Sequence, residues 1–260
     1  MRTNKARLGV EQLDAREVPA CIVTLPTPDT VAIVGDNAND TVIINDNGAG
    51  IIFGTATGFG GFAAVGIKNV RVNTGAGSDQ VTYNLIQNLL PGQVRTVNVQ
   101  LGTGTDRFTA NLFNPNTGVG SDLMRASQLT IVADGGDGGD WLRINAQHQV
   151  DVALGAALNM ILYGEAGNDV ITGYYQGHNY GKVSIRDFAG GAGEDTIRGV
   201  IREVAGSTGV SSGQVRGDDG NDNLSLYMWT QNPPSFAVLD GGAGIDLGTG
   251  TANVMKVNVP

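Results

Sequence analysis

The chain has 260 residues, 41% of them apolar, with 16 Lys and Arg against 25 Asp and Glu for a net charge of −9. That apolar content is sufficient for a buried core and is unlike that of a disordered chain. The acidic balance argues against a nucleic-acid partner, because phosphate binding needs clustered cations. No apolar run approaches the ~18 residues of a membrane span, and a single cysteine, Cys21, excludes an internal disulfide.

Residues 1–30 are expected to be an N-terminal tail followed by a linker, because Pro26 and Pro28 interrupt any regular pattern there. Within the tail, residues 8–20 (LGVEQLDAREVPA) resemble a short motif near the start of exported or surface proteins of planctomycete-type bacteria. Asp14 stands where Glu is commoner in that motif. The resemblance implies an extracellular or cell-envelope location. A frayed polar tail is the alternative interpretation, since no apolar stretch of a secretory signal follows the cations.

A glycine-rich stretch of six residues that ends in aspartate then recurs along the chain. Residues 190–195 (GGAGED) are the reference copy, 241–246 and 135–140 are the best further copies, and 164–169 and 217–222 are good ones. Residues 74–79, 101–106 and 35–40 are weaker. The eight closing aspartates are Asp40, Asp79, Asp106, Asp140, Asp169, Asp195, Asp222 and Asp246. Their separations of 24 to 39 residues indicate a solenoid, a propeller or an array.

Two sets of apolar residues keep a fixed distance from these aspartates. Two positions after the aspartate stand Val42, Val81, Phe108, Leu142, Ile171, Ile197 and Leu224. Seven positions before it stand Val72, Val99, Ala133, Leu162, Phe188, Val215 and Leu239. Alternating residues around both sets predict one strand entering and one leaving each loop. We therefore expect an all-β, single-domain parallel β-helix or β-roll-like solenoid over residues 31–260, with about one glycine-rich loop per coil and seven to eight coils.

The loops are similar to the Gly-Gly-x-Gly-x-Asp-x-apolar-x nonapeptide of RTX (hemolysin-type) repeats, over residues 35–248. The resemblance implies calcium held between loops of adjacent coils by aspartate carboxylates and loop carbonyls. Besides the eight aspartates, the ligand residues it implies are Gly135, Asp137, Gly164, Ala166, Gly190, Ala192, Gly217, Asp219, Gly241 and Ala243. The chain departs from the family because ~15–30 unrelated residues follow each copy, where the family has tandem copies.

Electrostatics also favours calcium. Aspartates stacked about 4.8 Å apart repel by about 0.9 kcal/mol in water and roughly 3.5 kcal/mol at an effective dielectric near 20. A hard cation reverses that sign, and oxygen ligands without His or Cys suit Ca²⁺. In the alternative interpretation the loops are Asx-type turns whose aspartates accept backbone N–H groups without metal.

A non-catalytic, calcium-binding β-solenoid with a structural or adhesive role, secreted or at a bacterial cell surface, is the predicted function. Its expected partners are calcium and either a surface polysaccharide or another envelope protein. The first alternative is a carbohydrate-binding or polysaccharide-lyase-like β-helix. Its candidate residues, which form no motif, are Arg143, Arg186, Asp187, Arg198, His148, His178, Tyr174, Tyr175 and Tyr180. A self-assembling envelope component, pairing through an edge strand at residues 254–259, is the second alternative.

Overall fold

A computed structural model describes residues 21–234 and 236–259 of the chain. The motif at residues 8–20 lies outside this part. The described chain is all-β without a helix, and its stacked parallel strands form a β-solenoid of about seven turns. The fold class expected from the sequence is therefore confirmed.

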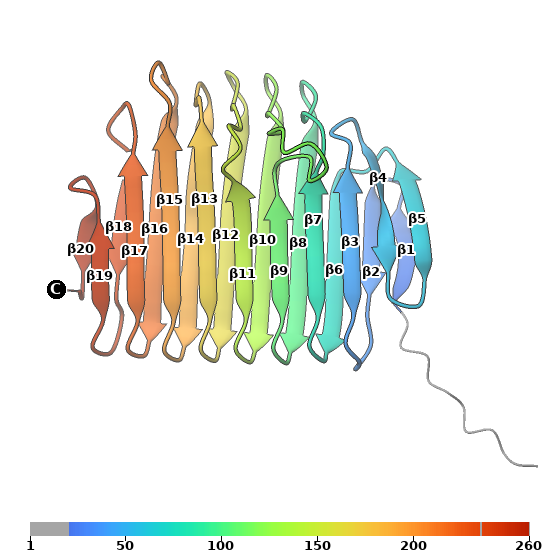
Figure 1. The fold of residues 1–260 in the computed structure, drawn as a ribbon, viewed down its shortest axis with the longest axis horizontal. Helices are drawn as coiled ribbons and strands as arrows, with labels where there is room; N and C mark the ends of the chain where they lie inside the picture. Colours follow the sequence, from blue (N-terminus) through green and yellow to red (C-terminus); the bar gives the residue numbers. More distant parts are fainter. Residues whose placement is uncertain (1–20, 235, 260) are drawn as a thin grey trace, which may run out of the picture.

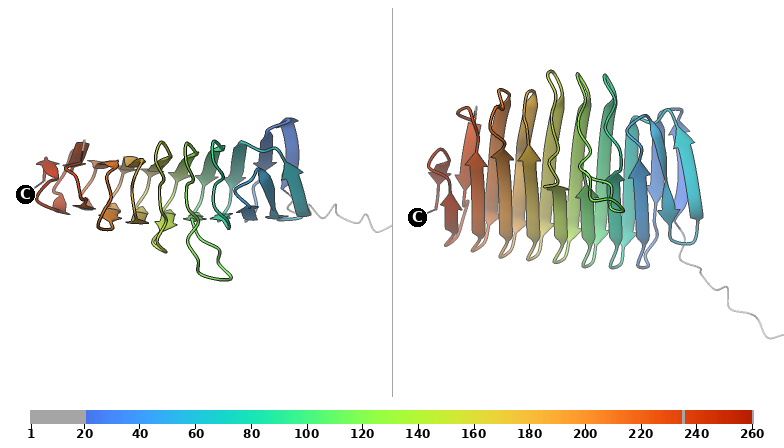
Figure 2. Two further views of the ribbon diagram at one scale, coloured as in Figure 1. Left: turned by 90° about the horizontal axis from the view of Figure 1, so that it is seen from above. Right: turned by 45° about the horizontal axis from the view of Figure 1, so that its top comes forward.

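Two ten-stranded sheets form the two faces of the solenoid (Figures 1 and 2). Sheet A contains, in order, β1 (Ile22–Thr27), β2 (Thr30–Val34), β6 (Asn69–Ala76), β8 (Val94–Thr103), β10 (Gln128–Asp137), β12 (Ala157–Ala166), β14 (Lys182–Ala192), β16 (Val210–Asp219), β18 (Phe236–Asp240) and β20 (Met255–Val257). Sheet B contains β19 (Leu247–Gly250), β17 (Asn223–Trp229), β15 (Thr196–Glu203), β13 (Val170–Gly177), β11 (Trp141–Ala146), β9 (Arg107–Asn111), β7 (Gln80–Leu85), β3 (Thr41–Asp46), β4 (Ile51–Ala56) and β5 (Gly60–Val65).

Each coil passes down a strand of sheet A, through a glycine-rich tight turn, and up a strand of sheet B. The tight turns form the lower end of the solenoid in Figure 1, and the longer, variable connections form the upper end. Both apolar sets predicted from the sequence are buried and in register. Val72, Val99 and Ala133 are direct partners on β6, β8 and β10, and Val81, Phe108 and Leu142 are partners on β7, β9 and β11. The core is therefore a narrow column of aliphatic side chains between the sheets.

The N-terminal end of the solenoid departs from the sequence prediction. Residues 22–30, expected to be a linker, contain strand β1, which pairs antiparallel with β2. Pro26 is tolerated because β1 is an edge strand, where a missing N–H breaks no ladder, and Pro28 lies in the turn that follows. Residues 51–65 form an antiparallel hairpin, β4 and β5, that extends sheet B beyond β3. Both additions cover the first coil.

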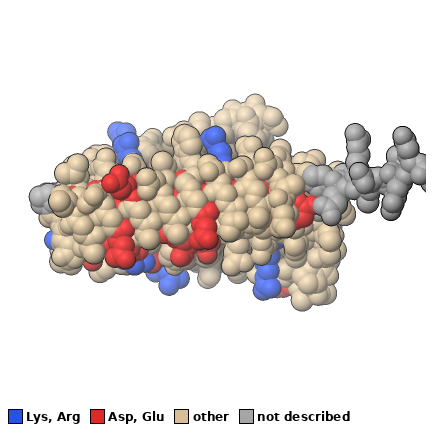
Figure 3. Space-filling view, turned by 90° about the horizontal axis from the view of Figure 1, so that it is seen from below, with Lys and Arg blue, Asp and Glu red and all other residues tan. Residues whose placement is uncertain are grey.

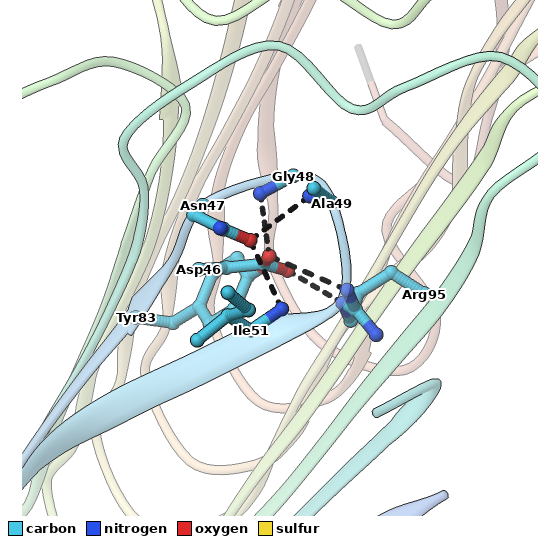
Figure 4. A network of polar contacts seen from close by, with 7 residues as sticks. All are labelled: Asp46, Asn47, Gly48, Ala49, Ile51, Tyr83 and Arg95. Atoms are coloured by element: carbon cyan, nitrogen blue, oxygen red, sulfur yellow. Dashed lines mark hydrogen bonds and ion pairs between the residues drawn. The ribbon is translucent and has the colours of Figure 1, made fainter. Parts of the chain in front are cut away.

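A buried ion pair fixes this end of the core (Figure 4). The carboxylate of Asp46 accepts hydrogen bonds from the Arg95 guanidinium, the Tyr83 hydroxyl and the Gly48 N–H. Arg95 and Asp46 have no exposed side-chain surface. Since an isolated buried charge is costly, the three strands β3, β7 and β8 are held in one arrangement here.

The C-terminal end is shorter than expected. The strand predicted at residues 254–259 is only the three residues of β20, paired with β18. Among the described residues, no helix has the length and apolar character that a membrane crossing requires.

Candidate functional site

The eight loop aspartates form one column inside the tight-turn end of the solenoid. All are buried, with 1% to 3% of their surface exposed. The backbone N–H of each aspartate donates to Oδ1 of the aspartate in the next coil, over 2.6–2.8 Å, in an unbroken series from Asp40 to Asp246. The sequence prediction that the carboxylates stack is therefore correct, and half of each carboxylate is satisfied by backbone, as the Asx-turn alternative expected.

Cys21 closes the N-terminal end of this column. Its thiol lies 3.3 Å from Oδ1 of Asp40 and donates to it. A preceding aspartate would present its backbone N–H at that place. Burial, followed by the nearby Asp40 carboxylate, raises the pKa of the Cys21 thiol to about 12, so the group stays a neutral donor.

The second carboxylate oxygen distinguishes this column from a simple series of turns. Oδ2 is buried and has no hydrogen-bond partner in the seven aspartates from Asp79 to Asp246. Leaving such an oxygen buried without a partner lowers the free energy of unfolding by about 1–3 kcal/mol, and by more when the group is charged. Seven unpartnered carboxylate oxygens in one row are therefore a feature that needs a ligand or a proton.

Oδ2 packs against a glycine in the five later tight turns. Their first residue is glycine, and a β-carbon added there would lie only 2.1–2.4 Å from Oδ2 of the same turn, so a larger residue fits only if the oxygen moves. The same point lies 2.4–2.9 Å from the backbone carbonyl oxygen of the residue that takes this place in the next coil. In the fifth turn, for example, Oδ2 of Asp169 and the carbonyl oxygen of Gly190 both lie against Gly164. Two unlike oxygen donors thus converge beside each of these glycines.

The three earlier turns differ from these five. Thr74 and Leu101, both fully buried, occupy the glycine position in the second and third turns. The first turn has Gly35 at this position with the same close approach, 2.1 Å to Oδ2 of Asp40 and 2.5 Å to the Thr74 carbonyl oxygen. There, however, Oδ2 of Asp40 accepts the backbone N–H of Asp36 at 3.1 Å. The structure thus separates Asp140, Asp169, Asp195, Asp222 and Asp246 from the rest, as the match to the repeat pattern does.

The turn backbone explains the glycines. The fourth residue has a φ between +135° and +149° in the last seven turns, a region reserved for glycine. At the second residue Glu165 and Asp218 adopt φ values of +76° and +71°, which are uncommon for residues with a β-carbon. The third-position carbonyls predicted as ligands, those of Asp137, Ala166, Ala192, Asp219 and Ala243, each accept the fourth-position N–H of the preceding coil. Each keeps one further lone pair.

The column strongly perturbs its own ionisation. Burial raises the pKa of Asp106 to about 6 and that of Asp169 to about 7, and the charges of neighbouring aspartates add to the effect. The pKa of Asp195 is raised to about 6 for the same reasons. Accepted backbone N–H groups act in the opposite direction but do not compensate. A buried carboxylate row without a counter-charge therefore attracts protons near neutral pH.

Further acids gather outside the column, on the surface of the tight-turn end (Figure 3). Asp137 and Asp219, both named from the sequence, are exposed, as is Glu165. Asp218 accepts a hydrogen bond from Arg216 at 2.8 Å. These side chains are not part of the buried column, and they raise the local negative potential around it.

A second polar ladder at the opposite end was not predicted. Backbone N–H groups of Asp122, Asp151 and His178 each donate to the side-chain oxygen of the preceding residue in the series Asn88, Asp122, Asp151. The His178 ring nitrogen Nδ1 also lies 3.2 Å from Oδ1 of Asp151. The sequence signal for this ladder was a polar residue followed by an apolar one at positions 88–89, 122–123 and 151–152, with separations of 34 and 29 residues. All of these side chains have partners, so the ladder anchors the connections.

The candidate lyase residues lie on different faces. Arg143 and Arg198 lie on sheet B, whereas Arg186 and Asp187 lie on β14 of sheet A. His148 contacts Phe113 with ring centroids 4.2 Å apart, in the variable connections. Tyr175 is buried, and its hydroxyl donates to the His178 carbonyl at 3.0 Å. Tyr174 is half-buried on β13, and Tyr180 is stacked on the His178 ring.

The fold and the column together define a parallel β-solenoid with an internal aspartate ladder. Comparisons with family models, with curated proteins and with solved structures found no match. In the described part of the chain, no three His, Cys, Asp or Glu side chains are grouped so as to hold a metal ion. Any ion in the column would therefore depend on pairs of aspartates and on backbone oxygens.

Proposed function

We propose that this chain is a calcium-stabilised structural solenoid that works outside the cytoplasm. The observation that carries the proposal is the row of buried Oδ2 atoms without partners, five of which lie against a glycine that a backbone carbonyl oxygen of the next coil also approaches. A donor set made only of carboxylate and carbonyl oxygens suits Ca²⁺ better than Zn²⁺. The residues present therefore fit the ion that the repeat pattern implies.

The residues that would hold calcium are Asp140, Asp169, Asp195, Asp222 and Asp246, with carbonyls of their turns and of the next coil. Bound Ca²⁺ would supply the positive charge that the column lacks. The Oδ1–backbone bonds already align successive carboxylates, so the chain itself places two negative groups at each interval. The third-position carbonyls and water can complete a shell of six to eight oxygens.

Coupled folding follows from this arrangement. Without a counter-charge, stacking the coils brings buried carboxylates together at a cost. Where calcium is abundant, its binding free energy becomes folding free energy. A solenoid of this kind would stay loosely folded during export and become rigid outside the cell, where it would serve as a structural or adhesive element.

The test combines calcium titration calorimetry with circular dichroism in calcium and in EGTA. About five ions per chain and a large loss of melting temperature on chelation are expected. Magnesium is the control, because it prefers a regular octahedral shell with several waters and should restore little stability. A chain that keeps its β-signal and melting temperature after thorough chelation would show that the aspartates are plain turn residues.

A further inference from the structure

The outer face of sheet B has a composition unlike the rest of this acidic chain. Four arginines lie on its strands: Arg107 on β9, Arg143 on β11, and Arg198 and Arg202 on β15. The only acids in the strands of sheet B are Asp46 and Glu203, and both are buried. Within the described residues this face is therefore purely cationic, although the whole chain has a net charge of −9.

These arginines are without ion pairs. No salt bridge joins Arg107, Arg143, Arg198 or Arg202 to an acid in the described part of the chain. On sheet A, by contrast, Arg216 pairs with both Asp187 and Asp218 at 2.8–2.9 Å. Unpaired guanidinium groups on one face are free to bind carboxylate or sulfate groups in a bidentate manner.

Aromatic rings lie between the arginines on the same face. The Arg107 guanidinium lies 4.8 Å from the centre of the Trp141 ring, and that of Arg198 lies 5.8 Å from the Tyr227 ring. Tyr227 is stacked on Trp229 with centroids 5.2 Å apart. Trp141 and Trp229 are 46% and 48% exposed, far more than rings that serve only the core.

Registration of the strands arranges these groups in rows along the solenoid axis. Arg143, Thr172 and Arg198 are partners in one row, and Tyr174, Val200 and Tyr227 are partners in the next. The two tyrosine rings therefore flank Val200. Val200 is fully buried, although Arg198 and Arg202, two positions before and after it on the same side of β15, are exposed. At the upper end of the rows a hollow of about 530 Å³ is lined by Arg202, Trp229 and Gln231 among others. Strands β9 to β17 span about 19 Å across four strand spacings, enough for a polymer rather than a single small ion.

We propose that this arginine–aromatic face binds an acidic polysaccharide lying along the solenoid axis. Its arginines would pair with the acidic groups, and its rings would stack on the apolar faces of sugar rings. Most of the remaining outward residues are neutral amides and hydroxyls, such as Asn111, Thr109 and Thr172, which suit sugar hydroxyls. A nucleic acid fits less well, because its dense phosphates would meet four cations on a chain that is otherwise strongly negative. The proposal does not depend on calcium in the aspartate column.

Polygalacturonate oligomers are a suitable probe, measured by calorimetry and by Trp fluorescence, with neutral dextran and a single-stranded oligonucleotide as comparisons. The double variant R143S/R198S removes two cations from the face. R71S/R186S is the matched control, since it removes two exposed cations from sheet A. Circular dichroism of each variant establishes that the fold is retained. Measurements at constant calcium separate this binding from calcium bridges to the acidic tight-turn end.

Affinity for polygalacturonate should fall at least about tenfold per arginine in R143S/R198S and stay unchanged in R71S/R186S. W229S should weaken binding without altering the salt dependence, because a ring carries no charge. Equal losses in both double variants, equal binding of dextran, tighter binding of the oligonucleotide, or no binding of the acidic polymer would each overturn the proposal.

Discussion

The hydroxyl of Thr74 donates a hydrogen bond to the backbone carbonyl of Leu101 in the next coil, over 2.8 Å. This one contact shows what the aspartate column needs. In the second tight turn a side chain of the protein fills the space between the coils and satisfies the inward carbonyl. In the five later turns glycine supplies no hydroxyl, and Oδ2 and the carbonyl oxygen of the next coil lie directly against it. The repeat therefore contains its own internal comparison between a threonine turn and an open turn, one without that side chain.

The substitution D169N should raise the melting temperature in EGTA and lower it in calcium. In EGTA the side-chain amide of D169N can donate to the Gly190 carbonyl, whereas the buried Oδ2 of Asp169 in the wild type has no partner. We expect a gain of about 1–3 kcal/mol, or some 2–4 °C per kcal/mol in melting temperature for a chain of this size. In calcium the same variant loses a charged ligand and should melt below the wild type.

D79N is the control for that experiment, because Thr74 already occupies the corresponding space. Its change in melting temperature should have the same sign in both buffers. If D169N instead behaves alike in calcium and in EGTA, the open turns hold no cation.

A reciprocal exchange should move a calcium site. Thr74→Gly removes the side chain beside Asp79, and Gly164→Thr adds one beside Asp169. Neither Thr74 nor Gly164 has a positive φ, but a β-carbon at Gly164 would lie 2.2 Å from Oδ2 of Asp169 and 2.5 Å from the Gly190 carbonyl oxygen, so G164T must displace these two donors. T74G should bind about one calcium more and lose about 1–2 kcal/mol in EGTA, from the lost hydrogen bond and the added glycine. G164T should bind about one fewer, as counted by calorimetry. An unchanged stoichiometry in both variants would contradict the role given to the glycine position.

The metal-free chain should become less stable as pH rises from about 5 to 8. The carboxyl pKa is about 6 for Asp106 and Asp195 and about 7 for Asp169, against 3.8 ordinarily. The folded chain therefore binds more protons than the unfolded chain between these values, so stability is greatest below them and is lost as pH rises through them. Each pKa unit of difference is worth about 1.4 kcal/mol. Urea unfolding in EGTA across this range measures the slope, which saturating calcium should flatten. A rise in stability with pH in EGTA would contradict the buried, unpartnered carboxylates.

Much of the fold could be predicted because the coils are nearly regular. The spacing of Val72 from Asp79 recurs at every later aspartate, that of Val81 recurs at every later one except Asp246, and stacking turns such a spacing into a ladder. Calcium, an extracellular location and the absence of catalysis remain predictions. The close approach of Oδ2 of Asp169 to Gly164 was less visible, since it depends on which residue stands at the first loop position.

Contacts between coils with irregular spacing could not be predicted. Asn88, Asp122 and Asp151 lie in connections of different length, and their ladder becomes evident only when the coils are aligned through the aspartates. The row that joins Arg143 to Arg198 has the same origin, because three strands separate the residues in sequence but one register aligns them in space. Strand β1 escaped prediction because Pro26 within it and Pro28 just after it resemble the prolines of a linker.

The Asp46–Arg95 pair should matter for stability but not for calcium. R95M leaves the Asp46 carboxylate buried with only the Tyr83 hydroxyl and the Gly48 N–H as donors. We expect a loss of about 3–5 kcal/mol, measured by urea unfolding, and of equal size in calcium and in EGTA because the pair lies apart from the aspartate column. The double variant R95M/D46L should recover much of the loss, since a buried ion pair replaced by apolar side chains of similar volume is often neutral. A double variant as unstable as R95M would mean that packing around Arg95, rather than the isolated charge, accounts for the effect.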